Sequence, residues 1–89
     1  MGRRSYPPLT PGEVIDILSA LGFAFKNQTG SHAHYERPPT TIDPTRRVVT
    51  VDKAEQDFGS VLMQSMVRQS GVGRKAFYGA TAHTAKKIR

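Results

Sequence analysis

The sequence predicts one small α+β domain whose elements follow the order helix, three strands, helix. Apolar residues recur at helical spacing in two segments, one in each half of the 89-residue chain. Between these segments the apolar pattern changes to a period of two, which is typical of strands. Three consecutive strands with short connections pair as an antiparallel sheet. Both helices are expected on one face of that sheet, since only there can their apolar stripes share a core.

The first helix has a well-marked start. Thr10 and Glu13 have the spacing of a capping box, in which each side chain bonds the backbone N–H of the other residue. Pro11 occupies the first helical position, where its missing N–H is no loss. Gly22 is expected to end the helix. The residues expected on the buried face are Val14, Ile15, Leu18 and Leu21.

Three strand-like runs follow this helix. Phe23 and Phe25 alternate with smaller or polar residues, and both are expected in the core. Residues 27–30 are predicted as a turn and residues 32–37 as the second strand. The β-branched run within residues 46–51 predicts the third strand.

The second helix is predicted from about Gly59 or Ser60 to Ser70, with Ser60 as the better N-cap candidate and Gly71 as its end. Residues 73–78 are predicted to add a short helical turn. The residues expected to face the core from the second helix are Val61, Leu62 and Met66, with Met63 or Val67.

The chain is therefore expected to divide into three parts. Residues 1–9 form an irregular N-terminal arm, residues 10–79 form the folded domain, and residues 80–89 form a basic, disordered tail. The layout of the folded domain is that of the double-stranded-RNA-binding domain, which contacts RNA through its shape and backbone.

Composition narrows the class of partner. Thirteen Lys and Arg against seven Asp and Glu give a net charge of +6, and the last acidic residue is Asp57. A basic half of this kind attracts phosphate backbones, although a solvated basic surface with no nucleic-acid partner would have the same composition. The absence of cysteine excludes disulfides and fits a reducing cytoplasm. No apolar run approaches the roughly 20 residues of a membrane span, so no membrane partner is expected.

The segment from Gly30 to Tyr35 carries the candidate chemistry. It holds Gly30, Ser31, His32 and His34 at the start of the second strand. Histidine exchanges protons near neutral pH, which suits it to general acid–base catalysis. Cleavage of RNA needs a base near the ribose 2′-OH and cations near the phosphate. The candidate cations are Lys26, Arg46 and Arg47; because Arg46 and Arg47 are adjacent on a strand, at most one can share a face with His32.

In the order and spacing of its motifs the sequence resembles the HicA toxin family, small ribonucleases of bacterial toxin–antitoxin pairs. The resemblance covers about residues 12–78. It rests on Leu21-Gly22-Phe23, on Gly30-Ser31-His32 with Tyr35, on Val49-Thr50-Val51, on Gly59-Ser60-Val61-Leu62 and on Arg68-Gln69-Ser70-Gly71.

The resemblance implies a dsRNA-binding-like fold that cleaves mRNA without a metal or other cofactor. It makes His32 the essential catalytic group and implies a HicB-type antitoxin that covers the site. The family often continues its third strand with a proline and a second histidine, whereas this chain continues with Asp52-Lys53-Ala54. Any role of the second histidine is therefore unfilled, or filled by His34.

Other interpretations remain open from the sequence. The chain could be an RNA-binding module that has lost catalysis, or an adaptor whose basic surface binds an acidic protein. His32 and His34 could form half of a metal site, with Glu36 or His83 as a third ligand. Ser31 could be a nucleophile, although nothing in the sequence places an orienting acid or an oxyanion hole beside it.

Overall fold

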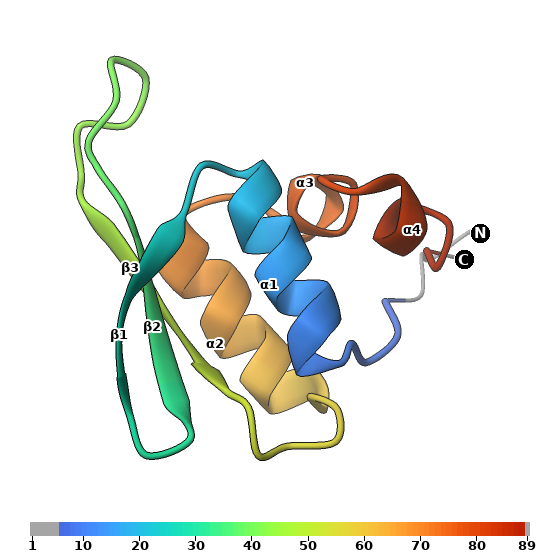
Figure 1. The fold of residues 1–89 in the computed structure, drawn as a ribbon. Coiled ribbons are helices and arrows are strands. Elements are labelled where there is room, and N and C mark those ends of the chain that lie inside the picture. Colours follow the sequence, from blue (N-terminus) through green and yellow to red (C-terminus); the bar gives the residue numbers. More distant parts are fainter. Residues whose placement is uncertain (1–5, 89) are drawn as a thin grey trace.

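A computed structural model describes residues 6–88, so the first five residues of the predicted arm lie outside it. The elements follow the predicted order, with two additional short helices at the C-terminal end (Figure 1). Their bounds are α1 Pro11–Ala20, β1 Ala24–Thr29, β2 His32–Arg37, β3 Arg47–Asp52, α2 Ser60–Ser70, α3 Arg74–Tyr78 and α4 Ala82–Ala85.

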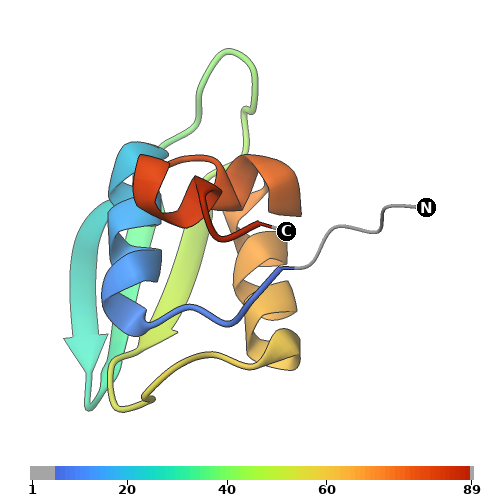
Figure 2. The ribbon, with the colours of Figure 1, turned by 90° about the vertical axis from the view of Figure 1, so that its right-hand side faces the viewer.

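The predicted α+β fold is confirmed. The strands form one antiparallel sheet in the order β1-β2-β3, which makes β2 central and leaves β1 and β3 as edges. Figure 2 shows α1 and α2 side by side on one face of this sheet. Among the residues that the structure describes, none forms a helix on the opposite face. This is the arrangement of the dsRNA-binding-like fold.

Alternation along the strands determines which side chains reach the core. Ala33, Val49 and Val51 are completely buried and Tyr35 nearly so, all on the face that α1 and α2 cover. The capping box of α1 forms as predicted: the Thr10 N–H donates to Glu13 Oε1 at 2.9 Å, and the Glu13 N–H donates to Thr10 Oγ1 at 3.2 Å. The core members on the two long helices are Val14, Ile17, Leu18, Met63, Met66 and Val67.

The prediction for the buried face of α2 is partly wrong. Val61 and Leu62 are 78% and 45% exposed, whereas Met63, Met66 and Val67 are buried. The buried positions follow the spacing of three and four that packs one helix face, and the two apolar residues at the start of α2 fall outside it. Ser60 is not the cap either: Gly59 occupies the N-cap position, without a side-chain hydrogen bond.

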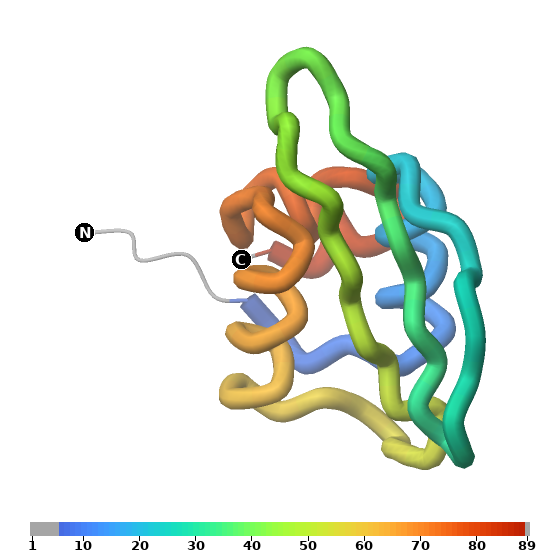
Figure 3. Tube along the Cα trace, turned by 90° about the vertical axis from the view of Figure 1, so that its left-hand side faces the viewer, coloured from blue at the N-terminus to red at the C-terminus, as the bar shows by residue number. Residues whose placement is uncertain are grey.

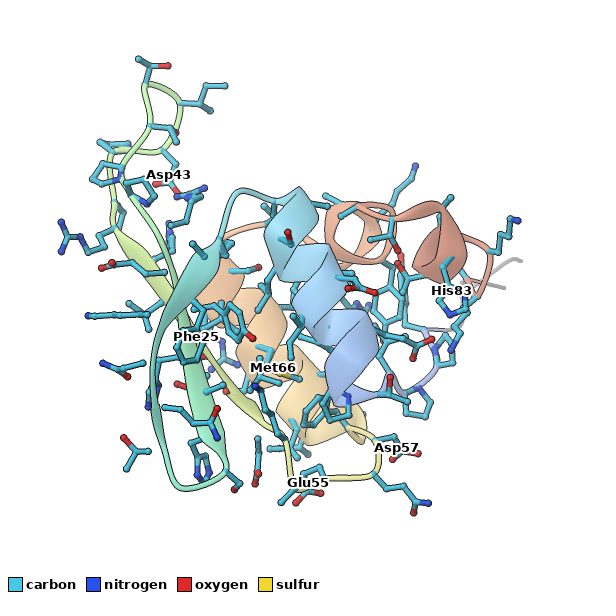
Figure 4. The ribbon with its side chains drawn as sticks, viewed as in Figure 1. Phe25, Asp43, Glu55, Asp57, Met66 and His83 are labelled. Carbon is cyan, nitrogen blue, oxygen red and sulfur yellow. The ribbon has the colours of Figure 1, made fainter. Side chains whose placement is uncertain are left out.

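Phe25 is also misassigned by the sequence pattern. It is 54% exposed, because β1 is an edge strand and the ring lies at the border of the core. Its ring packs edge-on against Tyr35, with centroids 5.8 Å apart, and Lys53 Nζ lies 5.9 Å from its centroid. Figure 4 shows Phe25 next to the strands.

The predicted disorder of residues 80–89 is corrected by the structure over most of that range. Thr81 caps α4 by accepting from the Thr84 N–H, and the buried Thr84 hydroxyl donates to the Tyr78 carbonyl at 2.6 Å. His83 and Lys87 both contact the Glu13 carboxylate on α1. A polar sequence can thus be ordered by specific hydrogen bonds that composition does not reveal.

None of the helices within residues 6–88 is long and apolar enough to cross a membrane.

Candidate functional site

A tight hairpin turn positions the candidate histidines. β1 continues to Thr29, which pairs with His32, so Gly30 and Ser31 alone form the turn. The predicted turn at residues 27–30 therefore begins three residues too early and ends one residue too early. Gly30 has φ +58, a value that L side chains rarely adopt and that fits the first central position of a two-residue hairpin loop. The turn therefore places Ser31 and His32 at the very start of β2.

The uncovered face of the sheet carries both histidines of the motif. β2 and β3 pair so that His32 lies opposite Asp52 and His34 lies opposite Thr50. The Thr50 N–H points away from β2 and donates to Gln69 Oε1 at 3.1 Å. Both cross-strand pairs are therefore of the non-hydrogen-bonded kind, in which facing side chains approach most closely.

His32 has a carboxylate partner. Its Nε2 lies 3.6 Å from Asp52 Oδ2, and the His32 side chain is 56% exposed. The ring nitrogen Nδ1 makes no hydrogen bond to any residue between 6 and 88. The imidazole is thus oriented from one side by Asp52 and open to a substrate on the other.

Asp52 is itself held by the two segments that meet at this end of the sheet. The Ser31 hydroxyl donates to Asp52 Oδ1 at 2.7 Å, and the Ala54 N–H donates to the same oxygen at 3.0 Å. The Lys53 N–H also donates to the Ser31 carbonyl at 2.8 Å. The Ser31 hydrogen bond is the main cause that lowers the pKa of Asp52, with the Ala54 amide second, so Asp52 stays charged at neutral pH.

His34 plays a different part on the same face. Its Nδ1 lies 2.9 Å from Thr50 Oγ1 across the strand pair. His34 is therefore engaged within the sheet, one cross-strand pair away from His32.

Two of the predicted cations share this face but not this end of it. Lys26 and Arg46 both contact Glu36, at 3.9 and 3.3 Å. Glu36 is four residues beyond His32 on β2, which corresponds to about 13 Å along a strand. The structure thus places the cations at one end of the uncovered face and His32 at the other.

Arg47 points to the opposite face, as the alternation of a strand requires for one of the two adjacent arginines. Its Nε lies 3.0 Å from Asp43 Oδ2, and Arg37 contacts the same oxygen at 2.6 Å. Hydrogen bonds from Arg47 and then Arg37 hold the pKa of Asp43 well below its usual range. Arg47 therefore stabilises the long β2–β3 loop. It is separate from the group formed by His32, Asp52, Ser31 and Ala54, which we call the His32 group.

The metal interpretation finds no support in the geometry. Among residues 6–88, no three His, Asp or Glu side chains gather closely enough to hold an ion. Of the two candidates for the third ligand, Glu36 contacts Lys26 and Arg46, and His83 lies on α4 with its Nε2 2.7 Å from Glu13 Oε2. Figure 4 shows His83 far from the strands that carry His32.

Asp52 is the site residue that sequence reasoning missed. The sequence marks it only as the start of a charged connection after the third strand. A nine-residue loop, residues 38–46, separates β2 from β3, and a loop of that length does not fix strand register. Asp52 could have been identified only from the register of the β2–β3 pair, which places it opposite His32.

Comparison with known families identifies the family of this chain. The family model described as the HicA toxin of bacterial toxin–antitoxin matches residues 12–72, which is more than half of the chain. The matched range contains every residue of the His32 and Asp52 group. No curated protein matches the chain significantly.

Proposed function

The chain belongs to the family of HicA toxins of bacterial toxin–antitoxin systems, and we propose that it is a metal-independent endoribonuclease that cleaves mRNA, with His32 as the general acid or base. The substrate follows from the net charge of +6 and from the uncovered sheet face. The proposed location is the cytoplasm, where mRNA is found.

The pairing of His32 with Asp52 is the observation that carries the proposal. A general base has to be exposed to its substrate and held in one orientation. His32 meets both conditions, since it is half exposed and faces a carboxylate that Ser31 and Ala54 fix in position. A histidine that merely ended a turn would not need this second layer of hydrogen bonds.

The proposed reaction uses the ribose 2′-OH as nucleophile. His32 accepts the 2′-OH proton, the 2′-oxygen attacks the adjacent phosphorus, and the bond to the 5′-oxygen breaks. The products are a 2′,3′-cyclic phosphate and a 5′-oxygen that takes a proton from water, and the imidazolium then returns its proton to solvent. Asp52 stabilises the imidazolium that forms. Lys26 and Arg46, about 13 Å along the strand, contact phosphates that neighbour the scissile one.

A HicB-type antitoxin is the proposed protein partner. An inhibitor of this reaction has to cover His32 or the cations of the same face. The uncovered face carries His32 at one end and Lys26 and Arg46 at the other, so an acidic surface that spans the face would cover both ends.

One observation favours a second function, an RNA-binding module without catalysis. Lys26 and Arg46 lie at the far end of the face from His32, and binding through them does not require the histidine. Ala54 also stands in the region where the family often has its second histidine. Such a module would bind RNA and leave it intact.

Expression in bacterial cells tests the proposal. Wild type, His32→Ala and His83→Ala are induced separately, and growth and the integrity of total mRNA are followed. His83 is the matched control, because it also pairs with a carboxylate but lies on α4. We expect wild type and His83→Ala to stop growth and fragment mRNA, and His32→Ala to do neither. Growth arrest with intact mRNA, lost in Arg46→Gln, would instead favour the binding module.

A further inference from the structure

A groove runs along the free edge of β3, next to the His32 group. It has a volume of about 260 Å³ and lies between β3, α2 and the segment that joins them. Figure 3 views the sheet with α2, in orange and yellow, beside β3 and on the side away from β1. The lining residues are His32, Thr50, Asp52, Glu55, Phe58, Leu62, Ser65, Met66 and Gln69.

The floor of the groove is apolar. Phe58 and Met66 are 1% and 4% exposed and form part of the core, while Leu62 is 45% exposed and contributes to the rim. Figure 4 shows Met66 on α2 between the helix and the strands. The apolar surface of the groove therefore continues from the buried Phe58 and Met66 to the exposed Leu62 at its rim, and His32 lines the same groove.

The rim of the groove carries two carboxylates, which accept hydrogen bonds. Asp52 and Glu55 contribute carboxylates, and within residues 6–88 neither Lys nor Arg lines the groove. Gln69 uses its Oε1 to accept from the Thr50 N–H, which leaves its amide NH₂ as a donor. The groove itself therefore gives a phosphate no cationic partner, and the scissile phosphate lies outside it, on the side of His32 away from Asp52.

We propose that this groove binds one unstacked nucleobase of single-stranded RNA, and that this base carries an exocyclic amine. The bound base lies next to the scissile phosphate on which His32 acts. The proposal rests on the ribonuclease function proposed above. The base face lies on Leu62 and Met66, and its amine donates to Glu55 or Asp52. Proteins read single-stranded RNA in this way, through splayed bases whose edges are hydrogen-bonded. Carboxylates accept from base amines such as cytosine N4.

The same chemistry rejects uracil. Where cytosine has its 4-amino donor, uracil has a carbonyl oxygen that repels a carboxylate, and the N3–H is the one donor left on that edge of uracil. A hydrogen bond to a charged group, gained or lost in this way, changes affinity by about tenfold. The groove therefore distinguishes cytidine, adenosine and guanosine from uridine.

Binding of RNA that cannot be cleaved tests the groove separately from catalysis. The probes are 2′-O-methyl tetranucleotides of C, A, G and U, titrated into the wild-type protein with ¹³C-methyl-labelled methionine. All four carry the same phosphates, so a difference between them reports the base. We expect the Met66 methyl resonance to move, Met63 to stay, and at least one amine-bearing tetramer to bind about tenfold more tightly than the U tetramer.

Two variants complete the test. Leu62→Ala should weaken the preferred tetramer, whereas Val61→Ala should not, because Val61 is an exposed neighbour on α2 that does not line the groove. Glu55→Gln should reduce the preference over uridine. Equal affinity for all four bases, or a Met66 resonance that does not move, would overturn the groove. A preference for an amine-bearing tetramer in a protein that leaves mRNA intact would support the groove and overturn the ribonuclease.

Discussion

Replacement of Asp52 by asparagine tests how the structure orients the proposed general base. Asparagine has the same shape, and its Oδ1 can still accept from the Ser31 hydroxyl and the Ala54 N–H. The turn is therefore kept. Only the atom that faces His32 Nε2 at 3.6 Å changes, from a charged oxygen to a neutral NH₂ group.

The expected loss of activity is modest. The His32 side chain is 56% exposed, so water screens its attraction to Asp52. Exposed ion pairs change an equilibrium by less than about fivefold, and we expect kcat to fall by about that factor. Removal of the whole imidazole in His32→Ala should cost roughly 10²–10⁴-fold. Asp52→Asn should therefore lie clearly between wild type and His32→Ala.

Single-turnover cleavage of an end-labelled mRNA fragment, with the RNA affinity measured in parallel, separates orientation from charge. Loss of a negative charge near a polyanion should leave the affinity unchanged or raise it. Asp16→Asn is the matched control, because it makes the same charge change at an exposed position of α1. A kcat for Asp52→Asn that equals wild type, or exceeds it, would refute the proposed role of Asp52.

Three further predictions concern binding and stability. Arg46→Gln should weaken RNA binding and reduce its salt slope by about 0.7, whereas Arg47→Gln, whose side chain is held by Asp43, should not change the slope; equal slopes, measured by fluorescence anisotropy, would contradict this. Gly71→Ala should lower the free energy of unfolding by about 1–2 kcal/mol in thermal melts, because Gly71 has φ +81 and a Cβ there would meet Arg47 Nε at 2.6 Å; Gly12→Ala, at an open position of α1, should not destabilise. Burial alone would raise the pKa of Glu13, but hydrogen bonds from Lys87, the Thr10 N–H and His83 lower it from 4.5 to about 2. The contribution of the charged Glu13 to the free energy of unfolding is therefore complete above pH 4.5 and is lost as the pH falls toward 2. Thermal melts of Glu13→Gln should show a smaller loss of stability over that pH range than melts of wild type.

Local signals were sufficient to predict most of the fold. The capping box at Thr10 and the β-branched run of β3 act within a few residues, so the elements follow from the sequence alone. The buried face of α2 did not follow, because exposed Leu62 and buried Met63 are both apolar and only the packing against β3 distinguishes them.

The site was predictable only in part, for a related reason. His32 belongs to a local motif, whereas its link to Asp52 depends on pairing between strands that a nine-residue loop separates. Strand alternation predicted that Arg46 and Arg47 point to opposite faces of the sheet. It did not predict which of the two shares a face with His32. The docking of α4 depends on Glu13, about 70 residues earlier in the chain, and no local pattern predicts that contact.

Cleavage of a long mRNA by purified protein in excess EDTA tests the central claim most directly. Wild type and His32→Ala are compared at equal concentration, with folding checked by circular dichroism and RNA binding checked by gel shift. We predict that wild type fragments the RNA in EDTA and that His32→Ala binds it but leaves it intact. Cleavage that stops in EDTA, or that persists in His32→Ala, would contradict a metal-independent ribonuclease in which His32 transfers the proton.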